Sequence, residues 1–226
     1  MGKSDALSTK ERLVAAAYDL FDERGFDGTT ADDIAQRAGV GRTTFFRTFR
    51  SKEDVIFPEH ELLLGRIEVR LASATPATRA LAIAEAARIV LRHYLAEGEL
   101  ARARYRLVST VPSLRAREVA SIQQYQRLFA RFVRVWMADV PDGTLRADLV
   151  SAAVVTAHNH VLRRWLNNET RSAEDEFDKA MEVALERFGQ PSAEEATVVV
   201  LRTTAGVEAV VARLQPLLKG ERAITR

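Results

Sequence analysis

Apolar residues recur at every third or fourth position along most of the chain, and this spacing is typical of amphipathic helices. The first stretch covers Thr9–Arg24, and Gly25 is placed to close it. Thr30 is placed to cap a second stretch, with two aspartates in its first turn. The Gly39–Gly41 segment interrupts that stretch, and Arg42–Phe49 forms a third. Short helices joined by a glycine-containing turn predict a helix-turn-helix unit.

Longer helical patterns follow this unit. A fourth helix is expected to begin after Ser51 as its cap, to carry Pro58 inside it as a hinge, and to continue toward Ala74. Further helices are expected over residues 76–97, 98–110, 112–140, 145–168 and 173–188. The residue pattern changes after Gln190, where the β-branched run EEATVVVLRT precedes another helical pattern.

The fold class predicted from these patterns is all-α, with about nine helices, because no strands alternate with the helices. We expect three parts along the chain. Residues 1–55 form a three-helix helix-turn-helix domain, residues 56–189 form a larger helical domain, and residues 190–226 form a C-terminal extension to which the pattern assigns no structure.

Composition narrows the class of protein. The 226 residues are nearly charge-balanced, with 33 basic and 31 acidic side chains and a net charge of +2. The chain has no cysteine, which excludes disulfides, thiolate nucleophiles and cysteine-ligated zinc and suits a reducing cytosol. No apolar run approaches the roughly 20 residues that a membrane-spanning helix needs, and the start lacks the apolar segment of a signal peptide. We therefore expect a cytoplasmic protein with no membrane partner.

Basic residues are nevertheless concentrated around the third predicted helix. No Asp or Glu occurs between Ile34 and Lys52. The basic residues of this span are Arg37, Arg42, Arg47, Arg50 and Lys52. A solvated surface would account for such a cluster on its own, but beside a helix-turn-helix pattern it predicts contact with nucleic acid.

The N-terminal run resembles the DNA-binding domain of the TetR family of bacterial transcription regulators. Its parts come in the family's order, which is TKERLVAAAYDLFDERG, then TTADDIAQRAGV, then a segment ending in FRTF, then SKED. The resemblance implies that Arg42–Phe49 is the recognition helix, whose N-terminal residues enter the major groove. The residues that it implies at the DNA are Thr30, Gly41, Arg42, Thr43, Thr44, Phe46, Arg47, Thr48 and Lys52.

The implied roles differ among these residues. Base edges are expected to meet Gly41, Arg42, Thr43 and Thr44, and an arginine can donate to both O6 and N7 of guanine. Family members usually carry Tyr where this chain has Phe46, which lacks a hydroxyl. Phosphate contacts are therefore expected to depend more on Arg47, Thr48 and Lys52. The helical spacing of Phe45 and Phe49 is typical of a core instead.

Aromatic and polar residues are mixed in the second part of the chain, as in a mostly apolar pocket with a few orienting polar groups. The candidate ligand-binding residues are Tyr94, Arg102, Tyr105, Arg106, Gln123, Phe132 and Trp136. The spacing of Phe129, Phe132 and Trp136 is also typical of a packed core, and this alternative stays open.

The stretch YRLVSTVPSLRARE is similar to a subgroup of actinobacterial TetR-like regulators near mycofactocin genes. That similarity implies a long-chain acyl-CoA effector, with Arg102, Arg106 or Arg115 holding its phosphate or carboxylate. Arginines on amphipathic helices also occur on solvated faces. The effector is thus expected to be an apolar or acyl-CoA-like small molecule.

The family resemblance also implies that the last two predicted helices form a four-helix interface between two subunits. Small residues in SAAVVTAHNHVLRRWL would permit close approach of helices. The candidate interface residues are Val150, Val154, Ala157, His158, Val161, Trp165, Phe177, Met181 and Phe188. His158 and His160 would point to nearly opposite sides of a helix, so no metal site is predicted.

Together these features predict a ligand-responsive transcription regulator, a homodimeric repressor that binds a palindromic double-stranded DNA operator and is released by a small molecule. An activator of the same fold would bind DNA in the same way. An all-α enzyme is the alternative from another class, but the chain has no GxSxG elbow, HExxH motif, phosphate-binding glycine loop or cysteine nucleophile. No cofactor is expected.

Overall fold

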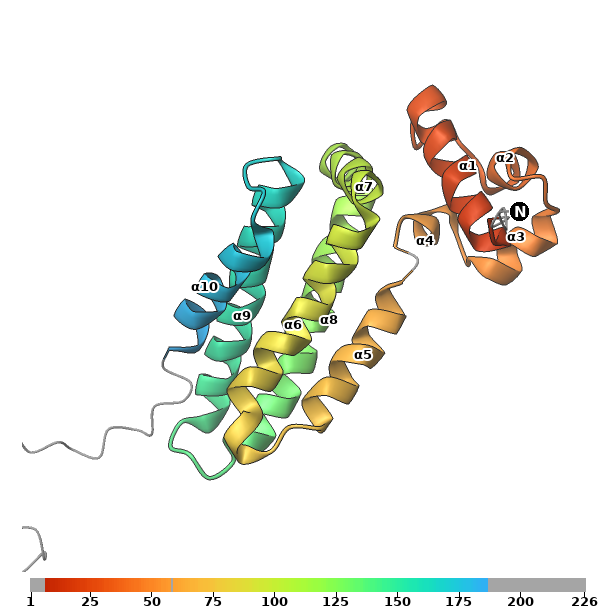
Figure 1. Ribbon diagram of the computed structural model, residues 1–226. Coiled ribbons are helices and arrows are strands. Elements are labelled where there is room, and N and C mark those ends of the chain that lie inside the picture. Colours follow the sequence, from red (N-terminus) through yellow and green to blue (C-terminus); the bar gives the residue numbers. More distant parts are fainter. Residues whose placement is uncertain (1–6, 58, 187–226) are drawn as a thin grey trace, which may run out of the picture. The chain divides into compact units, whose positions relative to one another are not determined.

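The structure is a computed structural model that describes residues 7–57 and 59–186 (Figure 1). In these residues the chain forms ten α-helices, one 3-10 turn and no strand, so the all-α prediction is confirmed. The predictions made for Pro58, Phe188 and the segment after Gln190 lie outside the described residues.

The first three helices follow the N-terminal pattern. Helix α1 covers Thr9–Arg24, α2 covers Ala31–Arg37 and α3 covers Arg42–Thr48. Thr30 caps α2 as predicted, because its hydroxyl oxygen accepts from the Asp33 N–H at 3.1 Å. The Asp33 carboxylate in turn accepts from the Thr30 N–H at 2.9 Å. These reciprocal bonds fix the start of α2.

The prediction of one long fourth helix is wrong, because two helices occupy its span. Helix α4 covers Lys52–Ile56, and α5 covers His60–Ala72. Phe57 leaves the helical conformation, with φ −123° and ψ 55°. A residue that precedes proline is kept out of the α region by a steric clash, and Phe57 precedes Pro58 in the sequence. The proline therefore ends α4 through its effect on Phe57.

Helix α4 begins after Ser51, as predicted, but without a hydrogen bond to the serine hydroxyl. Ser51 occupies the N-cap position, but its side chain makes no capping hydrogen bond. The carboxylate of Asp54 instead accepts the Arg50 N–H at 2.9 Å. A carboxylate in the first turn of a helix also interacts favourably with the helix dipole, so Asp54 can replace the missing cap.

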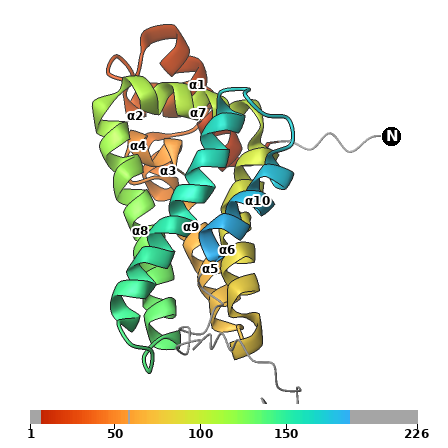
Figure 2. The same cartoon turned by 90° about the vertical axis from the view of Figure 1, so that its left-hand side faces the viewer.

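Five longer helices follow α5, and all but the second of them run alongside one another (Figures 1 and 2). After a 3-10 turn at Pro76–Thr78 come α6 (Arg79–Glu97), α7 (Glu99–Thr110), α8 (Pro112–Trp136), α9 (Gly143–Leu166) and α10 (Ala173–Leu185). The sequence pattern predicted each of them to within a few residues. The C-terminal end of α8 differs most, because the Met137 N–H turns back onto the carbonyls of Val133 and Arg134.

Buried residues form two hydrophobic clusters. One lies among α5, α6, α8, α9 and α10 and includes Ile83, Leu91, Phe129, Val154 and Phe177. The other lies among the first four helices and includes Leu13, Ile34, Phe45, Phe49 and Val55, so the predicted core roles of Phe45 and Phe49 are confirmed. Val108 of α7 and Leu114 of α8 belong to this second cluster as well. Helices α7 and α8 therefore pack directly against the helix-turn-helix unit.

Candidate functional site

The exposed face of α3 is set by the turn before it and by two buried phenylalanines. Gly39 has φ +67°, a conformation that glycine adopts without strain, and it ends α2. The Val40 N–H then bonds to the Ala35 carbonyl at 2.9 Å. Phe45 and Phe49 are buried on the inner side of α3. The exposed residues on the outer side are Gly41, Arg42, Thr43, Phe46 and Arg47.

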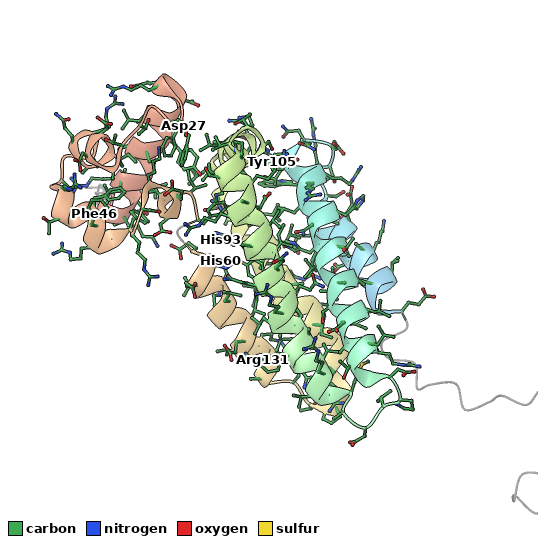
Figure 3. The ribbon with its side chains drawn as sticks, turned by 180° about the vertical axis from the view of Figure 1, so that it is seen from behind. Asp27, Phe46, His60, His93, Tyr105 and Arg131 are labelled. Carbon is green, nitrogen blue, oxygen red and sulfur yellow. The ribbon has the colours of Figure 1, made fainter. Side chains whose placement is uncertain are left out.

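Arg42 is held by two neighbours on this face. Its guanidinium forms an ion pair with Asp32 of α2 and lies 5.2 Å from the centre of the Phe46 ring. The Arg42 side chain is still 67% exposed. A planar guanidinium in this position can bond the edge of a guanine, because only one of its five N–H donors contacts Asp32. Phe46, labelled in Figure 3, supplies an aromatic face in place of the family's hydroxyl.

Lys52 and Thr48 already have protein partners. The Lys52 ammonium donates to the carbonyls of Phe26 at 2.8 Å and Thr29 at 3.0 Å. The Thr48 hydroxyl donates to the Thr44 carbonyl at 2.9 Å. Phosphate oxygens only accept, so Thr48 must break this bond before it can donate to DNA, whereas Lys52 has one donor left of three. The expectation that phosphate contacts depend on Thr48 is therefore not supported by its geometry.

Only part of the basic cluster is available for anions. Arg37 makes two bonds to the Glu23 carboxylate, at 2.8 and 2.7 Å, and these bonds lower the pKa of Glu23. Arg47 and Arg50 form no ion pair with any described residue. Thr30 is exposed at the start of α2, next to α3 in the chain. Among the described residues, no carboxylate pairs with Arg47, Arg50 or Lys52, and Arg47 and Arg50 also lack the carbonyl contacts that hold Lys52.

A cavity of ≈ 70 Å³ lies among α5, α6, α8 and α9. Its walls are mainly apolar, including Leu63, Val90, Phe129, Val154 and Leu162. Its polar lining comprises Glu59, His60, His93, Tyr94, Arg104, Glu118, Ser121, Tyr125, His158 and Asn159. Figure 3 labels His60 on α5 and His93 on α6, which contribute to the same wall. Phe57, at the end of α4, also lines this cavity.

A buried arginine connects the cavity with α1. Arg104 of α7 is 5% exposed, pairs with Glu97 of α6, and lies 5.1 Å from the centre of the Tyr94 ring. Tyr18 of α1 lies close enough for the Arg104 charge to act on its hydroxyl. Burial raises the pKa of both Tyr18 and Tyr94, so both phenols stay neutral and can act as donors.

The predicted ligand-binding residues are only partly brought together. Tyr94 lines the cavity, and Tyr105 lines a smaller neighbouring cavity of ≈ 30 Å³ (Figure 3). Arg102 pairs with Glu99 at 2.5 Å and stacks 4.4 Å from the centre of the Trp165 ring. The other four, which lie outside the main cavity, are Arg106, Gln123, Phe132 and Trp136.

These four lie elsewhere for two reasons. Arg106 and Gln123 occupy exposed positions of α7 and α8. Phe132 and Trp136 pack against each other, with ring centres 6.1 Å apart, and against the larger core. The core alternative for these aromatics is therefore the correct one. Mixed aromatic and polar composition could not distinguish these positions from Tyr125 and His158, which do line the cavity.

Most of the predicted interface residues face the protomer's own core. Val154, His158, Val161, Trp165, Phe177 and Met181 are all buried within the chain. The outward side of α9 and α10 instead carries a shallow groove lined by small and apolar residues, including Ala153, Ala157, Ala180, Val183 and Ala184. Val150 and Ala157 are partly buried, and Phe188 lies outside the described residues. The apolar residues identified in the sequence thus lie mainly on the inward side of α9 and α10.

A buried helix-turn-helix core, an exposed recognition helix with arginines, and a helical domain that holds a cavity define the class of ligand-binding DNA-binding regulators. The family described as "Bacterial regulatory proteins, tetR family" matches residues 13–57, and the "MftR C-terminal domain" matches residues 77–189. The chain therefore belongs to the TetR family and is a DNA-binding transcription regulator, not an enzyme.

Several known proteins are similar to the chain over most of its length. The HTH-type transcriptional regulator TcmR of Streptomyces glaucescens is 30% identical over 70% of this chain and 73% of its own. MftR of Mycobacterium tuberculosis, described as a mycofactocin biosynthesis transcriptional regulator, is 25% identical over 81% of this chain and 94% of its own. The structure of SmeT with triclosan is similar in fold, with a TM-score of 0.54, 18% identity, and coverage of 80% of this chain and 91% of SmeT.

Two further features concern partners and location. No helix in the described part of the chain is long and apolar enough to cross a membrane. Residues 7–57 and 59–186 contain no group of three or more His, Cys, Asp or Glu side chains arranged to hold a metal ion. His158 and His160, considered as ligands in the sequence, point apart: His158 is buried and His160 is exposed.

Proposed function

We propose that the chain is a homodimeric repressor that binds a palindromic operator through α3 and leaves it when a small molecule fills the cavity. The position of Phe57 carries this proposal. Phe57 directly follows α4, the helix after the recognition helix, and it also lines the cavity. A molecule that enters the cavity therefore meets a residue whose movement would shift the helix-turn-helix unit.

Two more contacts support this coupling. Asp54 of α4 pairs with Arg117 of α8, so α4 is tied to a helix that contributes cavity residues. Arg104 lines the cavity and lies beside Tyr18 of α1. An effector needs only to bind the released conformation more tightly than the DNA-bound one, and coupling free energies of about 1–3 kcal/mol are typical.

On DNA, we expect Arg42 to read a guanine and Arg47 and Arg50 to contact phosphates. In a two-fold dimer, the two α3 helices must lie roughly 34–36 Å apart to enter successive turns of the major groove. The groove on α9 and α10 offers a self-complementary surface for such a dimer, because small side chains permit close helix packing. Val183, with 77% of its surface exposed, lies within it.

The geometry favours a small apolar effector over an acyl-CoA. None of Arg102, Arg106 and Arg115 lines the cavity. Arg102 is paired with Glu99, and Arg115 donates to the Ser109 carbonyl at 3.2 Å. Arg104, which does line the cavity, is neutralised by Glu97. A coenzyme A phosphate would find no uncompensated cation there.

Repression is preferred over activation because SmeT, whose fold the chain shares, is described as the repressor of a multidrug efflux pump. An activator would make the same protein–DNA contacts, and a reporter gene placed behind the operator distinguishes the two. Repression predicts higher reporter expression when the regulator is deleted, whereas activation predicts lower expression.

The coupling can be tested with a side chain that imitates an effector. Ser121→Phe adds a ring at the cavity wall, and Val135→Phe adds the same ring at an exposed position of α8. The operator is first recovered by selection from a random duplex library, and affinity is then measured by fluorescence anisotropy. We expect Ser121→Phe to weaken operator binding at least tenfold and Val135→Phe to leave it unchanged. A folded Ser121→Phe protein with wild-type affinity would contradict the coupling.

A further inference from the structure

His158 presents an unused hydrogen-bond acceptor at the cavity. It lies on α9, lines the cavity and is 7% exposed. Its Nδ1 is 3.2 Å from the side-chain Oδ1 of Asn159, which can only accept, so Nδ1 carries the proton. Nε2 is therefore left with a lone pair, and it is buried without a partner among the described residues. A buried polar atom in this state is unfavourable unless something binds to it.

The imidazole is neutral at physiological pH. Burial lowers the pKa of His158 to about 4, and the bond to Asn159 compensates only in part. His158 also packs edge-on against Phe177, with ring centres 6.2 Å apart, which fixes the ring in an apolar setting. The unpaired nitrogen of this cavity-lining residue is thus an uncharged acceptor and not an imidazolium donor.

Neighbouring groups add further acceptors. His60 Nε2 contacts the side-chain oxygen of Gln124, so this nitrogen carries the proton and His60 Nδ1 accepts. The Tyr125 hydroxyl lies 3.0 Å from that Nδ1 and must donate to it, which leaves lone pairs on the Tyr125 oxygen. Glu118 also lines the cavity, and burial raises its pKa. An anionic ligand would meet acceptors here and would be disfavoured.

The cavity also limits the size of its occupant. A volume of ≈ 70 Å³ is about half of the roughly 150 Å³ of an engineered apolar cavity that binds benzene. A single ring with one polar substituent is therefore the largest occupant that we expect, and it would have to push the walls outward. Most of the ring would contact apolar walls such as Val90, Phe129 and Leu162.

We propose that the cavity binds a small, neutral, single-ring molecule whose hydroxyl or N–H donates a hydrogen bond to His158 Nε2. This inference rests on the proposed function only in calling that molecule the effector. The requirement for a donor follows from the proton position that Asn159 imposes on His158. A ligand of equal size without a donor would leave Nε2 unpaired and would bind more weakly.

Calorimetric titration of the full chain with phenol and with toluene tests this inference. The two molecules are nearly equal in size and shape, but only phenol can donate. The wild-type protein should bind phenol at least tenfold more tightly than toluene. His158→Phe removes the acceptor and should bring the two affinities within about twofold, while His158→Gln, which restores an acceptor, should recover part of the preference. Anisole, an ether without a donor, should behave like toluene.

The ratio of the wild-type affinities for phenol and toluene tests the inference even if a variant fails to fold. Equal affinities for phenol and toluene, or no phenol binding at millimolar concentration, would overturn the inference. A His158→Phe protein that still binds toluene but keeps the full preference for phenol would also overturn it. Operator binding is measured separately. Phenol that binds without weakening the DNA complex would contradict the proposed regulation but not the donor requirement.

Discussion

Arg42 shares the surface that would meet DNA with the carboxylate of Asp32. Its guanidinium is paired with that carboxylate and stacked near Phe46 in the free protein. A phosphate or a guanine that approaches Arg42 therefore also meets the negative charge of Asp32, which opposes its binding. Because the pair is largely exposed, its loss costs little, so exchange between Asp32 and DNA is easy.

Replacement of Asp32 should strengthen DNA binding. Asp32→Asn removes the competing charge, and we expect about two- to fivefold higher affinity for operator and scrambled DNA alike, since exposed pairs contribute up to about 1 kcal/mol. Asp22→Asn, a change at an exposed acid of α1, is the matched control. Fluorescence anisotropy at low and high salt measures both, and weaker binding by Asp32→Asn would show that Asp32 positions Arg42 instead of competing for it.

His158 makes stability depend on pH in a defined window. Its pKa of about 4 lies below the ordinary value, so the unfolded chain takes up the proton first as pH falls below about 6.5. Stability is then lost progressively down to about pH 4, by about 3 kcal/mol. Urea unfolding of wild type and His158→Phe at pH 7.5 and pH 4.5 gives the difference in stability between the two proteins at each pH. This difference should change between the two pH values, and an unchanged difference would contradict the contribution of His158.

At the scale of helices, α6 and α7 are joined by a buried ion pair that also borders α1. Arg104 and Glu97 are both largely buried, and Tyr94 and Tyr18 lie beside the guanidinium. A buried pair of this kind adds little net stability over apolar residues, but removal of one partner is costly because it leaves an unpaired buried charge. The pair therefore fixes the register of α7 against α6 more than it strengthens the core.

A double-mutant cycle on this pair should be strongly non-additive. Arg104→Met alone should lower the free energy of unfolding by about 3–5 kcal/mol, because the Glu97 charge is left buried. The double variant Arg104→Met/Glu97→Gln should recover much of that loss. Arg70→Met, which breaks the more exposed pair with Glu85, should cost about 1 kcal/mol or less. Urea unfolding followed by circular dichroism measures wild type, Arg104→Met, Glu97→Gln, the double variant and Arg70→Met, and additive losses would contradict a buried coupled pair.

The sequence predicted helices better than it predicted sites. Periodicity and capping residues located α1 to α3 and the later helices, since these signals are local. The proline that follows Phe57 in the sequence is a local signal for the end of α4. No local signal could show that Lys52 would bond the Phe26 and Thr29 carbonyls, or that Asp32 would reach Arg42. Those features depend on residues far apart in the chain that meet only in the folded protein.

Helix α9 has two apolar faces, which explains why most of the predicted interface residues lie on its inward side. Helix α9 buries Val154, His158 and Val161 against its own chain, while Ala153 and Ala157 line the outward groove. Large apolar residues produce most of the periodic pattern in a sequence, and this pattern does not distinguish a core from an interface, because large residues fill both. The small residues, whose signal is weak, mark the surface where a second helix can approach closely.

At the scale of the whole molecule, the proposed regulation needs two copies of the chain, because one recognition helix would cover only half of the proposed palindrome. The outward groove on α9 and α10 is the surface proposed for this pairing. Most of its residues are small or apolar, with His160, Glu176 and Lys179 among them, and all belong to the two C-terminal helices of the described chain. Dimer formation at this surface would set the distance between the two α3 helices.

A charge placed in this groove should separate the subunits. Val183→Lys lies in the groove, whereas Val69→Lys changes a valine of similar exposure on α5, outside it. Sedimentation velocity should give a dimer for wild type and Val69→Lys and a monomer for Val183→Lys. The monomer should bind a full operator at least tenfold more weakly. A dimeric Val183→Lys protein would place the interface elsewhere.

The most direct test of the central claim is fluorescence anisotropy with duplexes that tile the DNA upstream of the chain's own gene, together with operators recovered from a random library. Wild type should bind at least one of these duplexes tightly, resist scrambled competitor and weaken steeply as salt rises. Arg42→Ala should lose about 1–3 kcal/mol of discrimination between operator and scrambled DNA, while Arg50→Ala should weaken both equally. Wild-type binding no tighter to any of these duplexes than to scrambled DNA would contradict the account.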